Sequence, residues 1–365
     1  MHISELDTPA LLIDLDIFER NLARVAGYTK ANQLRLRPHT KTHKVPAVGK
    51  RQLDSGAVGL TVAKVGEAEV MLGSGTPDLL IAYPVIGQSK LARLTEIARK
   101  TRVTVALDSC IAANQLSEAA QDAKVNFAVL AEVDVGLGRV GVRPGEELLQ
   151  LAQSISRLPG LTFEGITFYP GHIKFLGEAG PEQALRDLGA VVKSILDDLQ
   201  RAGIEARVVS GGSTPTLFRS HEIAGLNEIR PGTYVYNDVN TVLAGTCGWN
   251  DCAASILTTV VSTARKGHMI VDGGSKTFSS DRTAGPGPVS YGRIVESPES
   301  ILQNLNEEHG YVDNTAATRE FKVGDRVRII PNHVCVAVNL HEQVYGVRNE
   351  QVEAVWKVEG RGKLQ

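Results

Sequence analysis

The sequence predicts an α/β protein in which a (β/α)₈ TIM-like barrel precedes a C-terminal, mainly antiparallel β domain. Over residues 17–240, short runs rich in Val, Ile and Ala alternate with helix-like segments. This alternation is typical of a parallel sheet with helical crossovers. About eight such repeats fit a barrel, with an open doubly wound sheet as the alternative. Over residues 241–365 the runs are β-prone, turn residues separate them, and no long helical pattern remains.

The elements of the barrel follow in order along the chain. The expected helices are 17–32, 45–57, 65–75, 88–100, 112–123, 144–158 and 182–203. The expected strands are 34–39, 59–63, 78–84, 102–109, 126–135, 163–170, 206–216 and 228–238. In the first helix Ile17, Leu22, Val25 and Ala26 share one face, as a helix packed on a sheet requires.

Composition limits the partners and the compartment. The 365 residues carry 39 Lys and Arg against 41 Asp and Glu, a balance that argues against a nucleic-acid-binding surface. No apolar run approaches the roughly 20 residues that span a bilayer, and no signal peptide is expected. Four cysteines in so long a chain are no disulfide scaffold, so we expect a cytoplasmic protein without a membrane partner.

Residues with useful chemistry follow the expected strands, at the end where barrels place their active sites. Lys41 follows "RLRPH", Arg139 follows "AEVDV", and Tyr169 and His172 follow "GITF". The late loop "SGGSTPT", 210–216, offers small residues, hydroxyls and free backbone N–H groups, which can hold a phosphate. A plain tight turn is the alternative for this loop.

The stretch "DVGLGRVG", 134–141, contains a formal G-x-G-x-x-G after a strand. A dinucleotide-binding fingerprint should open a helix directly, whereas Pro144 and Gly145 intervene here. The sequence therefore favours another use of this loop. Arg139 at its tip is a fixed cation that could hold a ring oxygen or a carboxylate.

In "PNHVCVAVN", 331–339, His333 and Cys335 stand two residues apart on a β-prone run. A strand would place both side chains on one face, and imidazole with thiolate is a zinc-type ligand pair. A core cysteine beside a satisfied histidine is the alternative. "EEHG", 307–310, could lie near this pair or form a solvated turn.

The stretch "RLRPHTKTHK", 35–44, concentrates basic residues after an apolar run. A charged surface loop is the ordinary interpretation. A lysine at the mouth of an apolar barrel is, however, a competent imine former. Together with a phosphate-binding loop in the same barrel, it indicates pyridoxal phosphate (PLP) as the cofactor.

Seven stretches in this order resemble the alanine-racemase-like (fold-type III) PLP enzymes, and among them the D-threonine aldolase and D-serine dehydratase branch. They are "DTPALLIDLDIFERN", "RLRPHTKTHK", "EVDVGLGRVGV", "FYPGH", "GGSTPT", "RPGTYVYND" and "PNHVC". The resemblance covers nearly the whole chain. It implies a PLP barrel, a β domain to which residues 1–16 add a strand, and a homodimer.

The resemblance also implies roles for particular residues. Lys41 would be the Schiff-base lysine, with Lys44 as the fallback, and His172 would face the substrate. Arg139 would lie near the cofactor ring and Tyr169 near its nitrogen. The phosphate would be held by Gly211, Gly212, Ser213 and Thr214, with a hydroxyl from Tyr236. His333 and Cys335 would bind a divalent metal, Zn or Mn.

The expected activity is that of a PLP- and metal-dependent lyase on small D-3-hydroxy amino acids. His-x-Cys and "GGSTPT" look more like the dehydratases of the D-serine type, which give a 2-keto acid and ammonia. Cleavage to glycine and an aldehyde, as by a D-threonine aldolase, is the alternative. An amino-acid racemase, a non-catalytic PLP carrier and a nicotinamide dehydrogenase fit the sequence less well.

Overall fold

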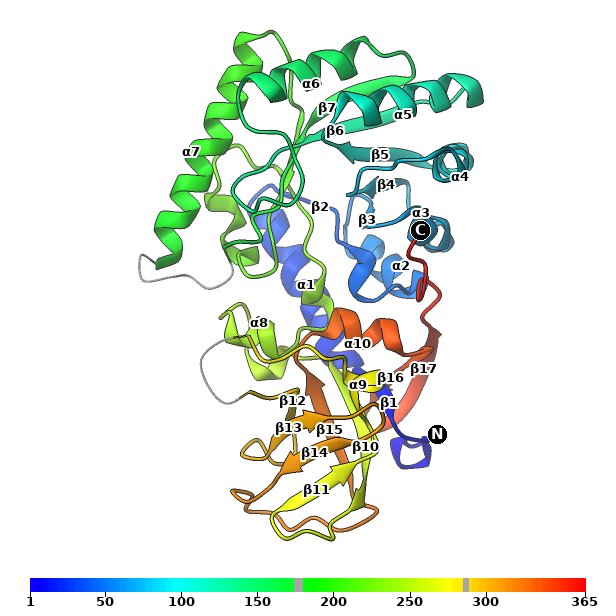
Figure 1. Cartoon of the computed structure of the whole chain (residues 1–365), viewed down its shortest axis with the longest axis vertical. Coiled ribbons are helices and arrows are strands. Elements are labelled where there is room, and N and C mark those ends of the chain that lie inside the picture. The colour runs from blue at the N-terminus through cyan, green and yellow to red at the C-terminus, as the bar shows by residue number, and fades with distance from the viewer. Residues whose placement is uncertain (174–179, 285–288) are drawn as a thin grey trace. The chain divides into compact units, whose positions relative to one another are not determined.

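The computed structural model describes residues 1–173, 180–284 and 289–365, and the chain forms two units. The barrel unit contains Val25–Lys41, Pro46–Gly232 and Lys363–Gln365. The β unit contains Met1–Arg24, Thr42–Val45 and Thr233–Gly362. Figure 1 shows the elements of each unit.

The barrel unit is built on an eight-stranded sheet of the described residues, in the order β2-β9-β8-β7-β6-β5-β4-β3. All of its ladders are parallel. The first and last strands of this order, β2 and β3, also meet. A parallel bridge joins His39, just after β2, to Thr61 of β3, and Thr61 N–H donates a 2.9 Å hydrogen bond to Pro38 O. The predicted TIM-like barrel is thereby confirmed, and the open sheet is wrong.

The strands of the barrel are short, and several are buried on both faces. They are β2 (Arg35–Leu36), β3 (Leu60–Val62), β4 (Asp78–Ile81), β5 (Arg102–Leu107), β6 (Phe127–Glu132), β7 (Leu161–Thr167), β8 (Val208–Gly211) and β9 (Glu228–Ile229). Every residue of β4 and β6 is buried, which explains why their sequences are continuous apolar runs rather than alternating ones. Leu80, Leu130 and Val208 pack together, so side chains from three strands share one cluster.

Helices alternate with these strands, and Figure 1 shows α4 to α7 outside the sheet. They are α1 (Leu15–Ala31), α2 (Pro46–Asp54), α3 (Val65–Met71), α4 (Gln88–Ala98), α5 (Cys110–Ala123), α6 (Glu146–Arg157) and α7 (Gly180–Arg201). In α6, Leu148, Leu151, Ala152 and Ile155 are buried, which is the single apolar face of a helix packed on a sheet.

The β unit is built on a nine-stranded sheet within the described ranges, in the order β11-β14-β13-β12-β15-β10-β1-β16-β17. Its strands are β1 (Ala10–Asp14), β10 (Ala254–Ser262), β11 (His268–Val271), β12 (Gly292–Ile294), β13 (Ile301–Leu305), β14 (Gly310–Asp313), β15 (Arg326–Pro331), β16 (Gln343–Arg348) and β17 (Gln351–Lys357). The pairing of β1 with β16 is parallel, and the other pairings are antiparallel. The mainly antiparallel β domain is thus confirmed.

Short helices also belong to the β unit. They are α8 (Val239–Leu243), α9 (Ser275–Phe278) and α10 (Val334–Leu340). The last of these contradicts the expected β-run at residues 331–339, with consequences for the candidate metal ligands. No helix of the part of the chain described here combines the length and the apolar character needed to cross a membrane.

Candidate active site

Tyr169 is the centre of the predicted site in the barrel unit. It follows β7, and its ring lies 5.9 Å from Lys41 Nζ and 5.0 Å from Arg139 Cζ, measured to the ring centroid. Lys41 follows β2 and Arg139 follows β6, so three strands bring these residues to one place. Two cations near one tyrosine ring make this spot suited to an anionic, planar ligand.

The loop that carries Arg139 is held by two carboxylates at the ends of neighbouring strands. Asp134 accepts hydrogen bonds from the N–H groups of Gly136 and Gly138, both at 3.0 Å. Asp108 accepts one from Gly141 N–H at 3.0 Å. The bonds from Gly138 and Gly136 hold the pKa of Asp134 below its usual value. The loop therefore has a defined shape at neutral pH, and no helix opens directly after it.

His172 is exposed and lies against this loop. A Cβ atom at Gly136 would come within 3.3 Å of its imidazole ring. Glycine at position 136, with a φ of +118°, is thus needed for conformation and for space. The structure places His172 beside the loop of Arg139, at the same end of the barrel as Tyr169.

The predicted phosphate loop begins at the last residue of β8. A Cβ atom at Gly211 would lie 2.5 Å from the ring of Phe168, and Gly212 has a φ of +86°. Ser213 and Thr214 are buried, and Ser213 Oγ lies 3.1 Å from Thr216 Oγ1. The loop therefore keeps its backbone close to β7, as a cradle for a phosphate requires.

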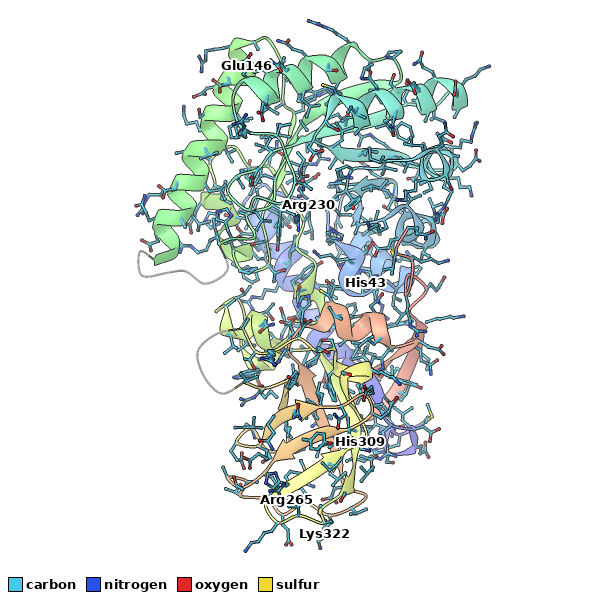
Figure 2. The ribbon with its side chains drawn as sticks, in the orientation of Figure 1. His43, Glu146, Arg230, Arg265, His309 and Lys322 are labelled. Atoms are coloured by element: carbon cyan, nitrogen blue, oxygen red, sulfur yellow. The ribbon has the colours of Figure 1, made fainter. Side chains whose placement is uncertain are left out.

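A buried arginine holds the ends of β7 and β8 beneath these loops. Arg230, labelled in Figure 2, donates to Ser210 Oγ at 2.5 Å and to Phe168 O at 3.2 Å. Glu228 Oε1 accepts a 2.7 Å hydrogen bond from Ser210 Oγ. Burial raises the pKa of Glu132, although the charge of Arg230 opposes that effect. These charges fix the residues directly before Tyr169 and the phosphate loop.

Two buried hydroxyls have no hydrogen-bond partner among the described residues. One is Thr167 Oγ1 at the end of β7 in the barrel unit, and the other is Tyr236 Oη in the β unit. Tyr236 is fully buried, and burial raises the pKa of its phenol, so the group stays a donor. Buried polar groups are normally satisfied. An anionic ligand would satisfy this unused donor.

Lys44, the fallback lysine, has a different environment from Lys41. Its Nζ donates to Asn339 Oδ1 at 2.8 Å in the β unit, and its φ is +54°. Lys44 is buried, whereas Lys41 is exposed. The structure therefore engages the amine of Lys44 on α10 and directs that of Lys41 toward Tyr169.

His333 and Cys335 do not lie on a strand. β15 ends at Pro331, His333 is the N-cap of α10, and Cys335 belongs to the first turn of that helix. The expected strand over residues 331–339 is wrong because hydrogen bonds to a distant part of the chain override the local β-propensity. The carboxylate of Asp238, far away in sequence, accepts a hydrogen bond from Val334 N–H at 3.0 Å and thereby caps α10.

The two predicted metal ligands nevertheless come together within the β unit. Burial by itself lowers the pKa of His333, but the negative charges of Cys335 and Asp238 outweigh it and raise this pKa to about 11. Asp238 Oδ2 lies 3.4 Å from His333 Nδ1. The Thr42 hydroxyl lies 3.2 Å from Cys335 Sγ. The raised pKa means that the imidazole is protonated at neutral pH, and a divalent ion would displace that proton on binding.

Among the described residues no group of three or more His, Cys, Asp and Glu side chains is arranged to hold a metal ion. The predicted pair alone would supply two side-chain ligands, and further positions would fall to water and substrate, as at catalytic metals. "EEHG" forms the exposed turn between β13 and β14, where Lys276 Nζ pairs with Glu308 at 2.6 Å. Of the two alternatives predicted for this stretch, the structure shows the solvated turn.

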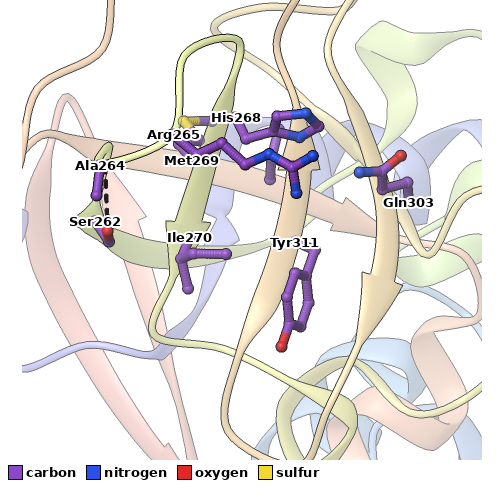
Figure 3. Close-up of a pocket in the computed structure, with 9 residues that line it drawn as sticks. Ser262, Ala264, Arg265, His268, Met269, Ile270, Gln303 and Tyr311 are labelled. Atoms are coloured by element: carbon purple, nitrogen blue, oxygen red, sulfur yellow. Dashed lines mark hydrogen bonds between the residues drawn. The ribbon is translucent and has the colours of Figure 1, made fainter.

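A hollow of about 200 Å³ lies within the β unit (Figure 3). Arg265, His268, Gln303 and Tyr311 line it. No residue predicted from the sequence is among its lining residues, so this hollow is separate from the candidate site.

Asp238 is the residue that sequence reasoning missed. Its only signal was its place at the end of the motif "RPGTYVYND", two residues after Tyr236. Asp238 and His333 are close only in three dimensions, so their pairing had no signal in the sequence.

The fold and these loops define a barrel enzyme of the kind that uses PLP. The sequence model described as "Alanine racemase, N-terminal domain" matches residues 13–239, and one for a serine dehydratase domain matches residues 253–347. A 3-hydroxy-D-aspartate aldolase from Paracoccus denitrificans (strain Pd 1222) is 34% identical, with 100% of this chain and 94% of the relative covered. The crystal structure of D-threonine aldolase from Filomicrobium marinum superposes with a TM-score of 0.92 at 31% identity, covering 99% and 98% of the two chains.

The D-threo-3-hydroxyaspartate dehydratase of Delftia sp. (strain HT23) is 35% identical over 90% of this chain and 91% of that protein. Solved structures described as D-threo-3-hydroxyaspartate dehydratase include alanine variants of a histidine and of a cysteine two positions later. The cysteine variant is described as metal-free, and it superposes with a TM-score of 0.88 at 30% identity over 98% of both chains.

The chain belongs to the alanine-racemase-like family of PLP enzymes, in the branch that holds these aldolases and dehydratases. It is a PLP-dependent lyase.

Proposed function

We propose that this lyase is a metal-dependent dehydratase of D-3-hydroxy amino acids, giving a 2-keto acid and ammonia from substrates of the D-serine type. The observation that carries the proposal is the placement of His333 and the thiol of Cys335 together at the start of α10, with Asp238 Oδ2 3.4 Å from His333 Nδ1. Solved variants of a D-threo-3-hydroxyaspartate dehydratase concern a histidine and a cysteine with the same spacing, which supports the interpretation.

The second candidate is an aldolase that releases glycine and an aldehyde. Its support is the full-length similarity to a 3-hydroxy-D-aspartate aldolase and to the D-threonine aldolase structure. Both activities use a substrate with an amino group at Cα and a hydroxyl at Cβ. They differ in whether the Cβ–O bond or the Cα–Cβ bond breaks.

The residues of the barrel unit suit the binding of PLP. The cofactor, when bound, supplies an aldehyde and an electron-withdrawing ring for bond breaking at Cα. Lys41 is the amine that would hold the aldehyde, and it would also take the Cα proton of the substrate. Arg139 and Tyr169 would orient the ring, and the N–H groups and hydroxyls from Gly211 to Thr214 would hold the phosphate.

The residues of the β unit suit the substrate hydroxyl. A divalent ion, when bound by His333 and Cys335, supplies a Lewis acid for that oxygen. Thr42, whose hydroxyl contacts Cys335 Sγ, directly follows Lys41 in the chain. In a dehydratase Lys41 would take the Cα proton, and the hydroxyl would take up a proton and leave as water. The released enamine would gain a proton at Cβ and react with water to give the keto acid and ammonia.

A product assay tests the proposal. The purified, PLP-loaded enzyme is given D-serine, D-threonine and D-3-hydroxyaspartate, with and without a chelator. We expect keto acid and ammonia that the chelator suppresses and added zinc or manganese restores. Glycine as the main product contradicts the dehydratase and supports the aldolase. Unchanged activity in metal-stripped protein contradicts the role of the metal.

Variants of Cys335 separate the thiol from other cysteines. We expect Cys335→Ala to lower bound metal and activity together. Cys110→Ala is the matched control, because Cys110 is an exposed free thiol at the start of α5 and should change neither. Cys335→Asp tests whether the ligand type selects the reaction. Glycine formation by this variant supports that role, and keto acid alone contradicts it.

A further inference from the structure

Asp238 is a fully buried carboxylate that serves two helices of the β unit. Its Oδ1 accepts a 2.8 Å hydrogen bond from Thr241 N–H, which caps α8. Its Oδ2 accepts a 3.0 Å hydrogen bond from Val334 N–H, which caps α10. The same Oδ2 lies 3.4 Å from His333 Nδ1. The carboxylate therefore caps the N-termini of both α8 and α10 and lies beside the imidazole of His333.

A charge in this position is more than either helix needs. Ser, Thr and Asn cap helices about as well as Asp, and they avoid the cost of burying a charge. A carboxylate, unlike these residues, can accept from both N–H groups and from the imidazole at once. The oxygen Oδ2, which accepts from Val334 N–H, also lies 3.4 Å from His333 Nδ1.

A carboxylate beside Nδ1 would leave the other ring nitrogen of His333 for a metal. A histidine that donates Nδ1–H to a carboxylate presents the lone pair of Nε2, and such a partner fixes the ring orientation. Cys335 has partners of its own, because the hydroxyls of Thr42 and Thr233 lie 3.2 Å and 3.8 Å from its Sγ. Each of the two proposed metal ligands thus has polar neighbours that can fix its orientation.

We propose that Asp238 is the positioning residue of the metal centre, which holds His333 Nδ1–H so that Nε2 binds the divalent ion with Cys335. The inference rests on the proposed function, because it assigns a role at the same metal site. It adds a residue that contacts neither substrate nor metal and that acts through His333.

Zinc affinity tests this inference without the reaction. The dissociation constant of Zn²⁺ is measured on the PLP-loaded full chain by competition with a chromogenic chelator. Loss of a carboxylate partner of a metal-bound histidine typically costs 10–100-fold in affinity. We expect a loss of about that size for Asp238→Asn and Asp238→Ser, both of which keep a side chain able to cap α8.

Thr241→Val is the matched control. Thr241 Oγ1 accepts from Asp238 N–H and donates to Asp238 O, both at 2.8 Å, so this change weakens the start of α8 but leaves the carboxylate intact. We expect lower thermal stability with zinc affinity close to that of the original protein. Co²⁺ substitution gives a second readout, because its absorption spectrum reports the ligand geometry. Asp238→Asn should change that spectrum, and Thr241→Val should not.

The outcomes separate this inference from the proposed function. Equal loss of affinity in Thr241→Val and Asp238→Asn overturns the inference, since the effect is then structural. Full affinity in both Asp238 variants also overturns it. If His333→Ala and Cys335→Ala leave zinc binding unchanged, the metal site of the proposed function fails as well. If only those two variants lose zinc, the proposed site stands and the role of Asp238 fails.

Discussion

Two lysines only three positions apart have different surroundings in this protein. Lys41 Nζ lies near the ring of Tyr169 in the barrel unit, whereas Lys44 Nζ is bonded to Asn339 in the β unit. Sequence spacing does not distinguish these amines, but their partners do.

The absorbance of bound PLP tests this assignment. We expect Lys41→Ala to lose the visible band that a lysine imine of PLP gives, because no other amine replaces it. Lys44→Ala is the control and should keep the band, even if the loss of its bond to Asn339 lowers stability. Loss of the band in Lys44→Ala alone would show that the assignment is wrong.

Gly211 is required by close packing. A methyl group there would lie 2.5 Å from the fully buried ring of Phe168, so the backbone of the phosphate loop has to move. We expect Gly211→Ala to weaken PLP binding and to lower the free energy of unfolding by about 1–3 kcal/mol, the usual cost of overpacking.

Fluorescence titration with PLP and urea unfolding measure the two effects. Gly27→Ala in α1 is the control, since a Cβ there meets nothing within 4 Å. That change should be neutral or slightly stabilising because alanine favours the helix. An unaltered PLP affinity in Gly211→Ala would contradict the proposed phosphate loop.

At the scale of elements, the loop after β6 depends on Asp134. Its carboxylate accepts from the N–H groups of Gly136 and Gly138, just before Arg139. We expect Asp134→Ala to weaken PLP binding about tenfold, because the loss of a hydrogen bond to a charged group frees the loop. Arg143→Ala is the control. It lies on the same loop, and its exposed pair with Glu147 of α6 should not affect PLP.

The pH dependence of Asp134 has a defined sign. Its pKa is lowered in the folded protein by the bonds from Gly138 and Gly136, so its contribution is complete above the usual value of 3.8. The contribution is lost as the pH falls below that value. The difference in urea stability between the original protein and Asp134→Ala should therefore shrink on acidification. A difference that grows in acid would contradict this role.

For the whole molecule, closure of the barrel depends on buried charge. Arg37, which is 3% exposed, pairs with Glu228 on β9 at 3.1 Å and with Asp78 on β4 at 2.9 Å. These pairs lie across the junction where β2 and β3 meet. We expect Arg37→Met to destabilise the protein by about 3–5 kcal/mol, because two buried carboxylates lose their buried cation and keep only the more exposed Arg35 and Arg102.

Urea unfolding of Arg37→Met and Arg35→Met checks this expectation. Arg35 is 40% exposed at its side chain and pairs with the same Glu228 at 3.4 Å. We expect its loss to cost about 0–1 kcal/mol, as for other surface pairs. Similar losses in the two variants would show that burial does not set the strength of these pairs.

The sequence by itself determined the fold class and the family. Alternation of apolar strands and amphipathic helices is a local pattern, and burial on both faces of β4 and β6 leaves continuous apolar runs in the sequence. The motifs around Lys41, Gly211 and Tyr236 are also local, and their order along the chain carried the resemblance. The roles of these residues, and the homodimer, stay predictions.

Only the tertiary structure decided the surroundings of His333 and Cys335. The run "VCVAVNL" has the β-branched residues of a strand, yet it forms α10 because Asp238 caps its first turn. The same carboxylate lies beside the imidazole of His333, although 95 positions separate the two residues in the chain. Local propensity is decided by neighbours in sequence. Caps and ion pairs between distant segments arise only when the folded chain brings their charges together.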